Sequence, residues 1–583
     1  MTRLKLDNAR HFLGKVWSLA IPYWQSEERG RAWGLLIAIV ALTLGLVYLD
    51  VQFNTWNREF YNALEQKNYA DFKDLILYFT LLAVLFMAGA IYKLYLTQML
   101  TMRWRVWLTN RYLDDWMERQ VYYRLELDKR GTDNPDQRIA EDLRLFTDGT
   151  LSLSLGLLSS VVTLASFVAI LWSVSGPLEL LGINIPGYMV WAAVIYAIVG
   201  SILTHYVGRP LIGVNFQQER FEADFRFNLV RLRENSEGVA LYRGETPERE
   251  GLRERFERVR GNWWELMRFT KRLTGFTQGY AQIAVIFPFV VAAPRYFSGA
   301  MPLGGLMQIA SAFGQVQNAL SWFVQSYGTL ANWRASVDRL LTFHAALDAA
   351  VHEAEAAPAI PQVRDAQPSV RADGLELAVP GSNDNPGRTL LSGASFAIAP
   401  GERVLISGPS GSGKSTIFRA LAGIWPFGAG TIRVPEKARV LFLPQKPYIP
   451  VGTLRDAVSF PAPTGTFGDE ALREALHDCR LDAFTDRLDE TQNWSMLMSG
   501  GEQQRLAVAR ALLHKPDFLF LDEATASMDE ALERDMYALL VERLPGTAIT
   551  SIAHNAGLSS FHTRSLTLKA SGSTGAAMRL QPG

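Results

Sequence analysis

The chain has 583 residues, of which 48% are hydrophobic, and equal numbers of basic and acidic residues give it a formal net charge of +0. This length exceeds what one hydrophobic core normally organises, so two or more domains are expected. The balanced charge does not indicate nucleic-acid binding. The single cysteine, Cys479, excludes an intrachain disulfide and a cysteine-cluster metal site.

Long apolar stretches fill the first part of the chain. Each is close to the length of about 20 residues that a helix needs to cross a bilayer. They predict a transmembrane domain over 1–345 embedded in the lipid bilayer, and the last stretch is the least hydrophobic. The six predicted helical spans lie at about 33–52, 75–97, 151–174, 187–207, 275–297 and 306–328.

Basic residues indicate the orientation of these spans. Lys and Arg gather before the first span and in the long connections after the second and fourth spans, whereas 175–186 contains none. The positive-inside rule therefore places both termini and the two long connections in the cytoplasm. An even number of spans brings the C-terminal half to the same side.

Polar residues recur along the last predicted span at intervals of three and four, so they share one helical face. They are Gln308, Ser311, Gln315, Asn318, Trp322 and Gln325, and Gln278 and Gln282 are spaced in the same way in the fifth span. Amides that face lipid are costly. Two interpretations remain, namely hydrogen bonds between packed helices or the wall of a water-filled cavity for a polar cargo.

Composition changes after the last span. Residues 346–369 are rich in Ala, Glu and Pro, which predicts a linker. A second domain is predicted over 370–570, followed by a flexible tail over 571–583. Within this domain, the apolar strand 403–406 leads into a glycine-rich loop and then a helix, which is the pattern of a phosphate-binding loop.

The loop carries the residue types that bind a nucleoside triphosphate. Its glycines let backbone N–H groups approach the phosphates at a helix N-terminus. Lys414 is expected to reach the terminal phosphates as a catalytic residue, and the Ser415 hydroxyl to bind Mg²⁺. The predicted nucleotide-binding residues here are Gly408, Pro409, Ser410, Gly411, Ser412, Gly413, Lys414, Ser415 and Thr416.

A second buried strand ends in two carboxylates. The run 518–521 is apolar and is followed by Asp522 and Glu523. Asp522 is expected to hold Mg²⁺ through water, and Glu523 to act as the general base or to orient the attacking water.

The sequence Met498-Ser499-Gly500-Gly501-Glu502-Gln503, placed ahead of a helix, resembles the signature motif of ABC ATPases. Met498 and Glu502 stand where that family usually has Leu and Gln. The resemblance implies that Ser499, Gly500, Gly501 and Glu502 contact nucleotide. It also implies roles for Gln445 in sensing the γ-phosphate and Mg²⁺, for Asp529 in the D-loop, and for His554 as the catalytic switch histidine.

The same resemblance bears on base choice and on assembly. The aromatic residue that usually stacks on adenine is missing near Val379-Pro380, so GTP use stays open beside ATP. In ABC ATPases, the phosphate loop of one domain faces the signature of another. Because this chain has one copy of each motif, the resemblance implies half a transporter that works with a second identical subunit.

Three membrane segments, 55–64, 133–139 and 288–297, resemble the SbmA/BacA-like family, and 235–242 resembles the EAA-like segment of a wider group that includes peroxisomal fatty-acyl transporters. The expected fold is a membrane α-helical domain of the ABC exporter type plus an α/β P-loop ATPase domain. The implied function is ATP-driven import of peptides, such as antimicrobial peptides, or of other bulky hydrophilic solutes, such as cobalamin-like compounds, across a bacterial inner membrane. Export or flipping of lipid-like or fatty-acyl compounds is the alternative, and a membrane-tethered ATPase sensor or scaffold is a third hypothesis.

Overall fold

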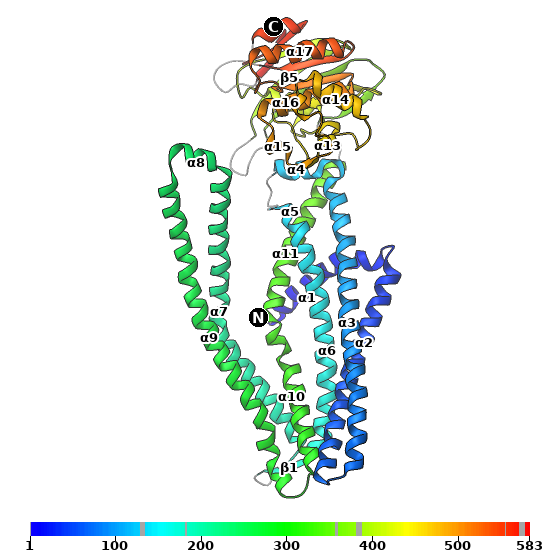
Figure 1. The fold of residues 1–583 in the computed structure, drawn as a ribbon, viewed down its shortest axis with the longest axis vertical. Helices are drawn as coiled ribbons and strands as arrows, with labels where there is room; N and C mark the ends of the chain where they lie inside the picture. Colours follow the sequence, from blue (N-terminus) through cyan, green and yellow to red (C-terminus); the bar gives the residue numbers. More distant parts are fainter. Residues whose placement is uncertain are drawn as a thin grey trace. The chain divides into compact units, whose positions relative to one another are not determined.

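The computed structural model describes residues 2–128, 134–180, 183–355, 360–379, 387–553, 556–570 and 578–582. It forms two compact units (Figure 1). The first contains residues up to Asp114 and Asp133–His344, and the second contains Asp115–Thr132 and the chain from Ala345 onward.

The first unit consists of long helices. Five stretches of helix in the described part of the chain are long and apolar enough to cross a membrane, and they extend well beyond the apolar spans expected from hydropathy. The main helices of this unit are α1 (Thr2–Gln25), α2 (Arg29–Glu65), α3 (Tyr69–Met117), α6 (Leu143–Ser175), α7 (Tyr188–Glu234), α8 (Ser236–Tyr242), α9 (Glu245–Phe297), α10 (Leu303–Gln325) and α11 (Tyr327–Glu355, entering the second unit).

The helix α10 corresponds to the predicted sixth span but is not among the five helices that meet the hydropathy criterion. Its amide side chains lower its hydropathy. It packs against α2, α6, α7 and α9, and Ile309, Phe313 and Val316 lie in a buried core with Phe167 and Leu171 of α6. Neighbouring helices rather than lipid therefore surround much of α10.

The two helices α7 and α9 form a long antiparallel pair that is closed by the short helix α8 (Figure 1). Tyr196 and Tyr280 stack at 4.4 Å between ring centroids. Each hydroxyl also donates a hydrogen bond to the other residue's backbone carbonyl, at 2.6 and 2.8 Å. A side chain at Gly200 would collide with the Tyr280 ring, so this glycine is needed for the close approach of the two helices.

The second unit contains a ten-stranded sheet in the order β3-β7-β4-β5-β14-β13-β6-β12-β11-β8. Strands β8, β11, β12, β6 and β13 run parallel. The strands are β3 (Gln362–Asp365), β4 (Val370–Ala378), β5 (Thr389–Ile398), β6 (Arg403–Ser407), β7 (Gly428–Pro435), β8 (Val440–Leu443), β11 (Phe518–Asp522), β12 (Ala548–Ile552), β13 (Arg564–Ala570) and β14 (Met578–Pro582).

Helices complete this α/β unit. The largest buried cluster joins β8, β11 and β12 to α13, α14, α16 and α17. The helices are α12 (Lys414–Leu421), α13 (Leu454–Ser459), α14 (Asp469–Asp478), α15 (Trp494–Leu497), α16 (Gly500–His514) and α17 (Glu530–Arg543). The helix α4 (Val121–Asp128), from the connection between α3 and α6, also belongs to this unit, because Leu127 packs against the core that includes Ile360 and Val370.

Two boundary predictions are wrong in part. The predicted linker 346–369 begins as a continuation of α11 to Glu355, because its Ala and Glu residues favour helix. It also includes β3, which pairs with β7. The predicted flexible tail 571–583 contains β14, which pairs with β13 through backbone hydrogen bonds that the composition of the tail did not reveal. Residues 571–577 and 583 lie outside the described residues.

Candidate nucleotide-binding and transport sites

The glycine-rich loop connects β6 to α12 as predicted from the sequence. Gly408, Gly411 and Gly413 all have positive φ angles, of 152°, 72° and 92°. A Cβ atom at Gly408 would lie 2.9 Å from the Cβ atom of Leu568, whereas at Gly411 it would meet nothing within 4 Å. Gly413 is the N-cap of α12. The loop therefore needs its glycines for backbone conformation, and Gly411 leaves open space beside the helix N-terminus.

The side chains of the loop divide into exposed and buried groups. Pro409 and Ser410 are exposed, while Ser412 and Thr416 are buried. Lys414 is also buried, and its Nζ atom donates to the carbonyls of Gly408 and Pro409 at 2.8 and 3.0 Å. The ammonium is thus curled over the loop that is predicted to hold the phosphates.

Ser415 and Asp522 meet at the edge of the sheet. The Ser415 hydroxyl donates to Asp522 Oδ1 at 2.9 Å. Burial raises the pKa of the Asp522 carboxyl, and the neighbouring Glu523 adds to this, while the Ser415 hydrogen bond, Arg419 and Lys414 oppose it. The nearby cations therefore do not fully offset the effect of burial on this carboxylate. The Ser415 hydroxyl and the Asp522 carboxylate are oxygen ligands of the kind that a divalent cation prefers.

Glu523 follows Asp522 in a left-handed backbone conformation, with φ of 50°. Its N–H donates to the carbonyl of Ile552 at 3.0 Å. Gln445, two residues after β8, donates through Nε2 to Glu523 Oε2 at 2.9 Å. The structure therefore brings Gln445, Asp522, Glu523, Ser415 and the loop into one site, although they are far apart in sequence.

The signature segment starts α16 and has a capping box. The Ser499 hydroxyl accepts from the N–H of Glu502, and the Glu502 carboxylate accepts from the N–H and the hydroxyl of Ser499, both at 2.8 Å. The departure from the usual Gln thus gives an acidic residue to the first turn, where it accepts from the backbone N–H of the N-cap residue Ser499. Gly500 and Gly501 lie against Ser527, because a Cβ atom at Gly501 would be 3.1 Å from the Ser527 carbonyl oxygen.

Sequence reasoning assigned no role to Gln504, which is 1% exposed. Its Nε2 donates to the Gln445 carbonyl at 3.0 Å, and its Oε1 accepts from the Ser527 N–H at 2.8 Å. One buried amide therefore connects the segment of Gln445 to the D-loop. Its place within the helix beside the signature could have indicated importance, but only the fold reveals both partners.

Replacing Gln504 by Glu should make ATP turnover depend on pH. A carboxylate can accept from Ser527 but cannot donate to Gln445, whereas the protonated acid can do both. Burial is expected to raise the pKa of the introduced carboxyl, so activity should be retained at low pH and lost as pH rises through that pKa. The wild-type enzyme assayed at the same pH values is the control, and a parallel profile for both would contradict this coupling role.

The remaining predicted residues have mixed outcomes. Asp529 caps α17 by accepting from the Leu532 N–H at 2.9 Å, close in sequence to Ser527. His554 lies outside the described residues. Val379 is 38% exposed and offers no aromatic ring, and Pro380 also lies outside the described residues.

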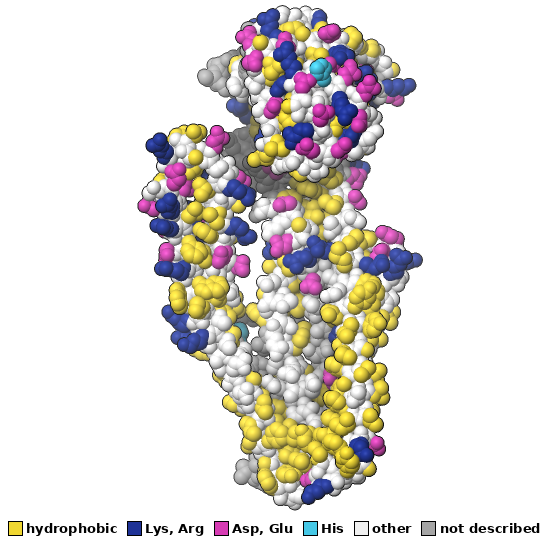
Figure 2. Space-filling model, in the orientation of Figure 1, with side chains coloured by type: hydrophobic (Ala, Val, Ile, Leu, Met, Phe, Trp, Pro, Cys, Tyr) yellow, Lys and Arg dark blue, Asp and Glu magenta, His cyan; other side chains and the backbone are white. Residues whose placement is uncertain are grey.

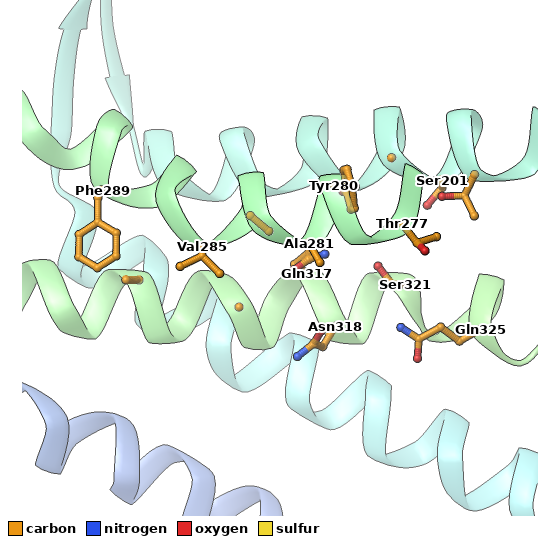
Figure 3. A pocket seen from close by; sticks show the side chains of 15 residues that line it. Ser201, Thr277, Tyr280, Ala281, Val285, Phe289, Gln317, Asn318, Ser321 and Gln325 are labelled. Carbon is orange, nitrogen blue, oxygen red and sulfur yellow. The ribbon is translucent and has the colours of Figure 1, made fainter. Parts of the chain in front are cut away.

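A pocket of about 480 Å³ lies between α7, α9 and α10 (Figure 3). Thr277, Ser321 and Gln325 line one end, and Val285 and Phe289 line the other. The remaining lining residues are Gly200, Ser201, Thr204, Tyr280, Ala281, Ala284, Ala310, Gly314, Gln317 and Asn318. None of these described residues is charged at neutral pH, so the pocket offers hydrogen bonds at one end and apolar contact at the other.

The polar stripe predicted on α10 only partly coincides with this pocket. Asn318 and Gln325 line it, but Gln308 is buried, and its backbone carbonyl accepts from Asn54 Nδ2 at 3.1 Å. Gln317 lines the pocket although it was not in the stripe. A heptad-spaced stripe drifts around a straight helix, and α10 has neighbours on several sides. Its amides therefore divide between packing and pocket.

The glutamines of the predicted fifth span do not line this pocket. Gln278 and Gln282 are exposed on α9. Ser201 and Thr204 of α7 line it instead. Their role could not be predicted from the sequence, because single hydroxyl residues within an apolar stretch form no recognisable pattern.

Two family models match the chain. Residues 17–297 match the ABC transporter transmembrane region 2, and residues 391–526 match the ABC transporter model. The inner membrane ABC transporter ATP-binding protein YddA of Escherichia coli (strain K12) is 34% identical over 557 residues, which cover 94% of this chain and 96% of that protein.

More distant relatives and one solved structure extend this result. ABC transporter D family member 2, chloroplastic, of Arabidopsis thaliana is 32% identical and covers 95% of this chain and 85% of its own. The lysosomal cobalamin transporter ABCD4 of Mus musculus is 27% identical, with 98% and 96% covered. A bacterial Atm1-family ABC exporter with ATP bound has the same fold, with a TM-score of 0.67 at 18% identity over 94% of each chain.

The membrane helices, the phosphate loop and the full-length relatives lead to one assignment. The chain belongs to the ABC transporter family, as a multi-pass half-transporter related to the D family that couples ATP hydrolysis to transport.

Proposed function

We propose that two copies of this chain form an ATP-driven transporter of bulky, uncharged, hydrogen-bonding solutes across a bacterial inner membrane. The observation that carries this proposal is the pocket between α7, α9 and α10, whose amides and hydroxyls would be costly if they faced lipid. The mammalian relative named as a lysosomal cobalamin transporter agrees with such a cargo. So does the resemblance of 55–64, 133–139 and 288–297 to SbmA/BacA-like proteins, which also favours import.

The chemistry of the pocket limits the cargo further. None of its described lining residues is a carboxylate that could pair with a cationic group, or a Lys or Arg that could pair with a phosphate. Its amide and hydroxyl groups suit peptide bonds, amides or sugar-like hydroxyls, and Val285 and Phe289 suit an adjoining apolar portion. A peptide or a cobalamin-like compound has both kinds of surface.

The ATPase residues take the following proposed roles. Lys414 and the loop N–H groups bind the phosphates of ATP. Mg²⁺, when bound, would neutralise phosphate charge, and Ser415, Gln445 and Asp522 are placed to hold it, Asp522 through water. Glu523 activates or orients the attacking water, and His554 contacts the γ-phosphate.

The need for a second copy is supported by exposed groups in each unit. Ser499 and Gly500 are exposed at the start of α16, where the signature would meet the nucleotide of a partner subunit. In the membrane unit, Leu241 and Tyr242 of α8 are 77% and 90% exposed. These apolar side chains fit a role in docking on the ATPase domain of the second copy. We place the ATPase domain, both termini and the two long connections after the second and fourth spans in the cytoplasm, following the distribution of basic residues.

Apolar substitutions in the pocket should impair transport and spare basal ATP hydrolysis. We expect the double variant Gln317→Leu and Asn318→Leu to lower uptake by about tenfold, because two lost hydrogen bonds of about 0.6 kcal/mol or more each weaken cargo binding. Uptake towards the ATPase side is measured as ATP-driven release of preloaded labelled peptide or cobalamin from the lumen of proteoliposomes that contain the protein in both orientations, with ATP outside.

The matched control makes the same amide-to-Leu change at Gln278 and Gln282, which lie on α9 but outside the pocket. Equal uptake by the pocket variant and the wild type would contradict the proposal. ATP outside drives only those transporters whose ATPase domains face outward, so an importer releases preloaded cargo from the lumen, whereas an exporter accumulates external cargo in it.

A lipid-like cargo is the second candidate, and the apolar end of the pocket at Val285 and Phe289 favours it. In that case Val285→Asn should impair transport more than the amide substitutions do. The opposite order is expected for a hydrophilic cargo.

A further inference from the structure

A second pocket, of about 570 Å³, lies between α1, α2, α3, α6, α10 and α11. This size is within the range of about 300–1,000 Å³ that accommodates small organic ligands. Its lining is dominated by aromatic and aliphatic side chains. Six of the chain's 15 tryptophans line it, namely Trp17, Trp24, Trp33, Trp104, Trp322 and Trp333.

Glycines of α6 position two of these rings. A Cβ atom at Gly149 would lie 2.5 Å from Cδ1 of Trp333, and one at Gly156 would lie 2.8 Å from Nε1 of Trp322. The rings are therefore seated directly on the helix backbone. Trp333 is also fixed by a hydrogen bond from Nε1 to the Thr150 hydroxyl at 2.9 Å. The pocket wall is held in place by these contacts.

The pocket offers little to water. The Thr150 hydroxyl is already used, because it accepts from Trp333 and donates to the Phe146 carbonyl at 2.6 Å. The other hydroxyls in the lining, Ser154 and Ser326, are isolated among Leu and Trp side chains. An ordered water needs two to four polar partners, so an apolar occupant fits this pocket better.

Basic residues flank the pocket along the sequence, one of them within α1 and two in the first turn of α2. Lys15 precedes the lining residues Val16 and Trp17, and Arg29 and Arg31 precede Trp33. All three basic side chains are exposed. Figure 2 shows Lys and Arg side chains, together with Asp and Glu side chains, over the α1–α2 turn, next to the hydrophobic surface of α2 and α3. A tryptophan-lined pocket beside exposed cations is the arrangement expected at the interface of an anionic membrane leaflet.

We propose that this pocket binds an acyl chain of an anionic phospholipid, with the headgroup beside Lys15, Arg29 and Arg31. The site is distinct from the polar pocket between α7, α9 and α10, with which it shares no lining residue. It does not depend on the nature of the cargo.

Quenching of tryptophan fluorescence by brominated lipids tests this site in the full-length protein. The protein is placed in nanodiscs with increasing mole fractions of phosphatidylglycerol or phosphatidylcholine brominated on the acyl chains. We expect quenching at a lower mole fraction of the anionic lipid. Each basic residue near a membrane surface contributes about fivefold in affinity, so the double variant Arg29→Gln and Arg31→Gln should raise the midpoint for phosphatidylglycerol by up to about 25-fold.

Filling the pocket provides the second arm. Ser154→Phe should remove the low-midpoint component of quenching, whereas Ser152→Phe, the same substitution at an exposed position of α6 that does not line the pocket, should retain it. ATP turnover of both variants shows that they are folded. Arg249→Gln with Arg253→Gln, on α9, is the charge control and should leave the midpoint unchanged.

Three results would overturn the proposal. Equal midpoints for the two lipids in the wild type would show that no anionic headgroup is selected. Unchanged quenching in Ser154→Phe would place the lipid elsewhere. Displacement of the brominated lipid by transported cargo, or disulfide crosslinking of two copies through cysteine introduced at Trp17, would assign the pocket to cargo or to the partner subunit.

Discussion

Replacing Glu523 by Gln is expected to lower ATP turnover by a factor of about 100 to 10,000, the usual contribution of a positioned general base. The carboxylate accepts a hydrogen bond from Gln445 Nε2 at 2.9 Å, and the backbone N–H of Glu523 donates to the Ile552 carbonyl. Gln preserves the size of the side chain but cannot take a proton from water. ATP binding should persist, so hydrolysis and binding of labelled ATP are measured on the same preparation.

The matched control is Asp517→Asn, the same carboxylate-to-amide change just before the opposite end of β11. Asp517 accepts from the Arg439 N–H at 2.7 Å and is remote in register from the phosphate loop. It should change stability slightly and turnover little. If Glu523→Gln hydrolyses ATP at the wild-type rate, another residue acts on the water, and the proposed role is wrong.

The same variant separates transport from signalling. A transporter in which Glu523→Gln blocks turnover should stop accumulating cargo. A membrane-tethered sensor or scaffold would still dimerise with ATP and pass on its signal. Cargo uptake and dimerisation measured together therefore decide between the two hypotheses.

The placement of the phosphate loop between a strand and a helix, and of two carboxylates after a buried strand, could be predicted from the sequence, because phosphate chemistry demands particular residues in particular order. In the phosphate loop, a Lys and a hydroxyl residue must follow the glycines, and elsewhere a carboxylate must follow a buried strand. Gln445 was inferred from the family resemblance and Glu523 from its position after a buried strand, and the fold brings the two side chains within 2.9 Å. What could not be predicted was Gln504, because its two partners are 59 and 23 positions away in sequence.

The membrane half was less predictable, because the same side chain can face lipid, a neighbouring helix or a cavity. Hydropathy located the apolar spans but not the lengths of the helices, which continue as polar segments held by backbone hydrogen bonds. Gln308 and Asn318 belong to the same predicted stripe, yet Gln308 is buried against α2 and Asn318 lines the pocket. That difference depends on which helices surround α10, which the spacing alone does not specify.

Two inactive variants should restore ATP hydrolysis when they are combined, if each site is shared between subunits. Lys414→Ala removes the ammonium that lies over the phosphate loop, and Ser499→Phe blocks the start of α16. Each homodimer should be inactive. In a mixed dimer, one site combines both damaged elements and the other combines the intact phosphate loop of one subunit with the intact signature of its partner.

The isolated mixed dimer has one intact site of two, so about half of the wild-type turnover is expected if the sites act independently. The measurement is ATPase activity after co-expression, with two affinity tags to isolate the mixed dimer. A chain that carries both substitutions, mixed with wild type, is the matched control, because its mixed dimers have two half-damaged sites. Background turnover of the mixed dimer of Lys414→Ala with Ser499→Phe would mean that each ATPase domain completes its site within one subunit. The proposal of ATP sites shared between two subunits would then be wrong.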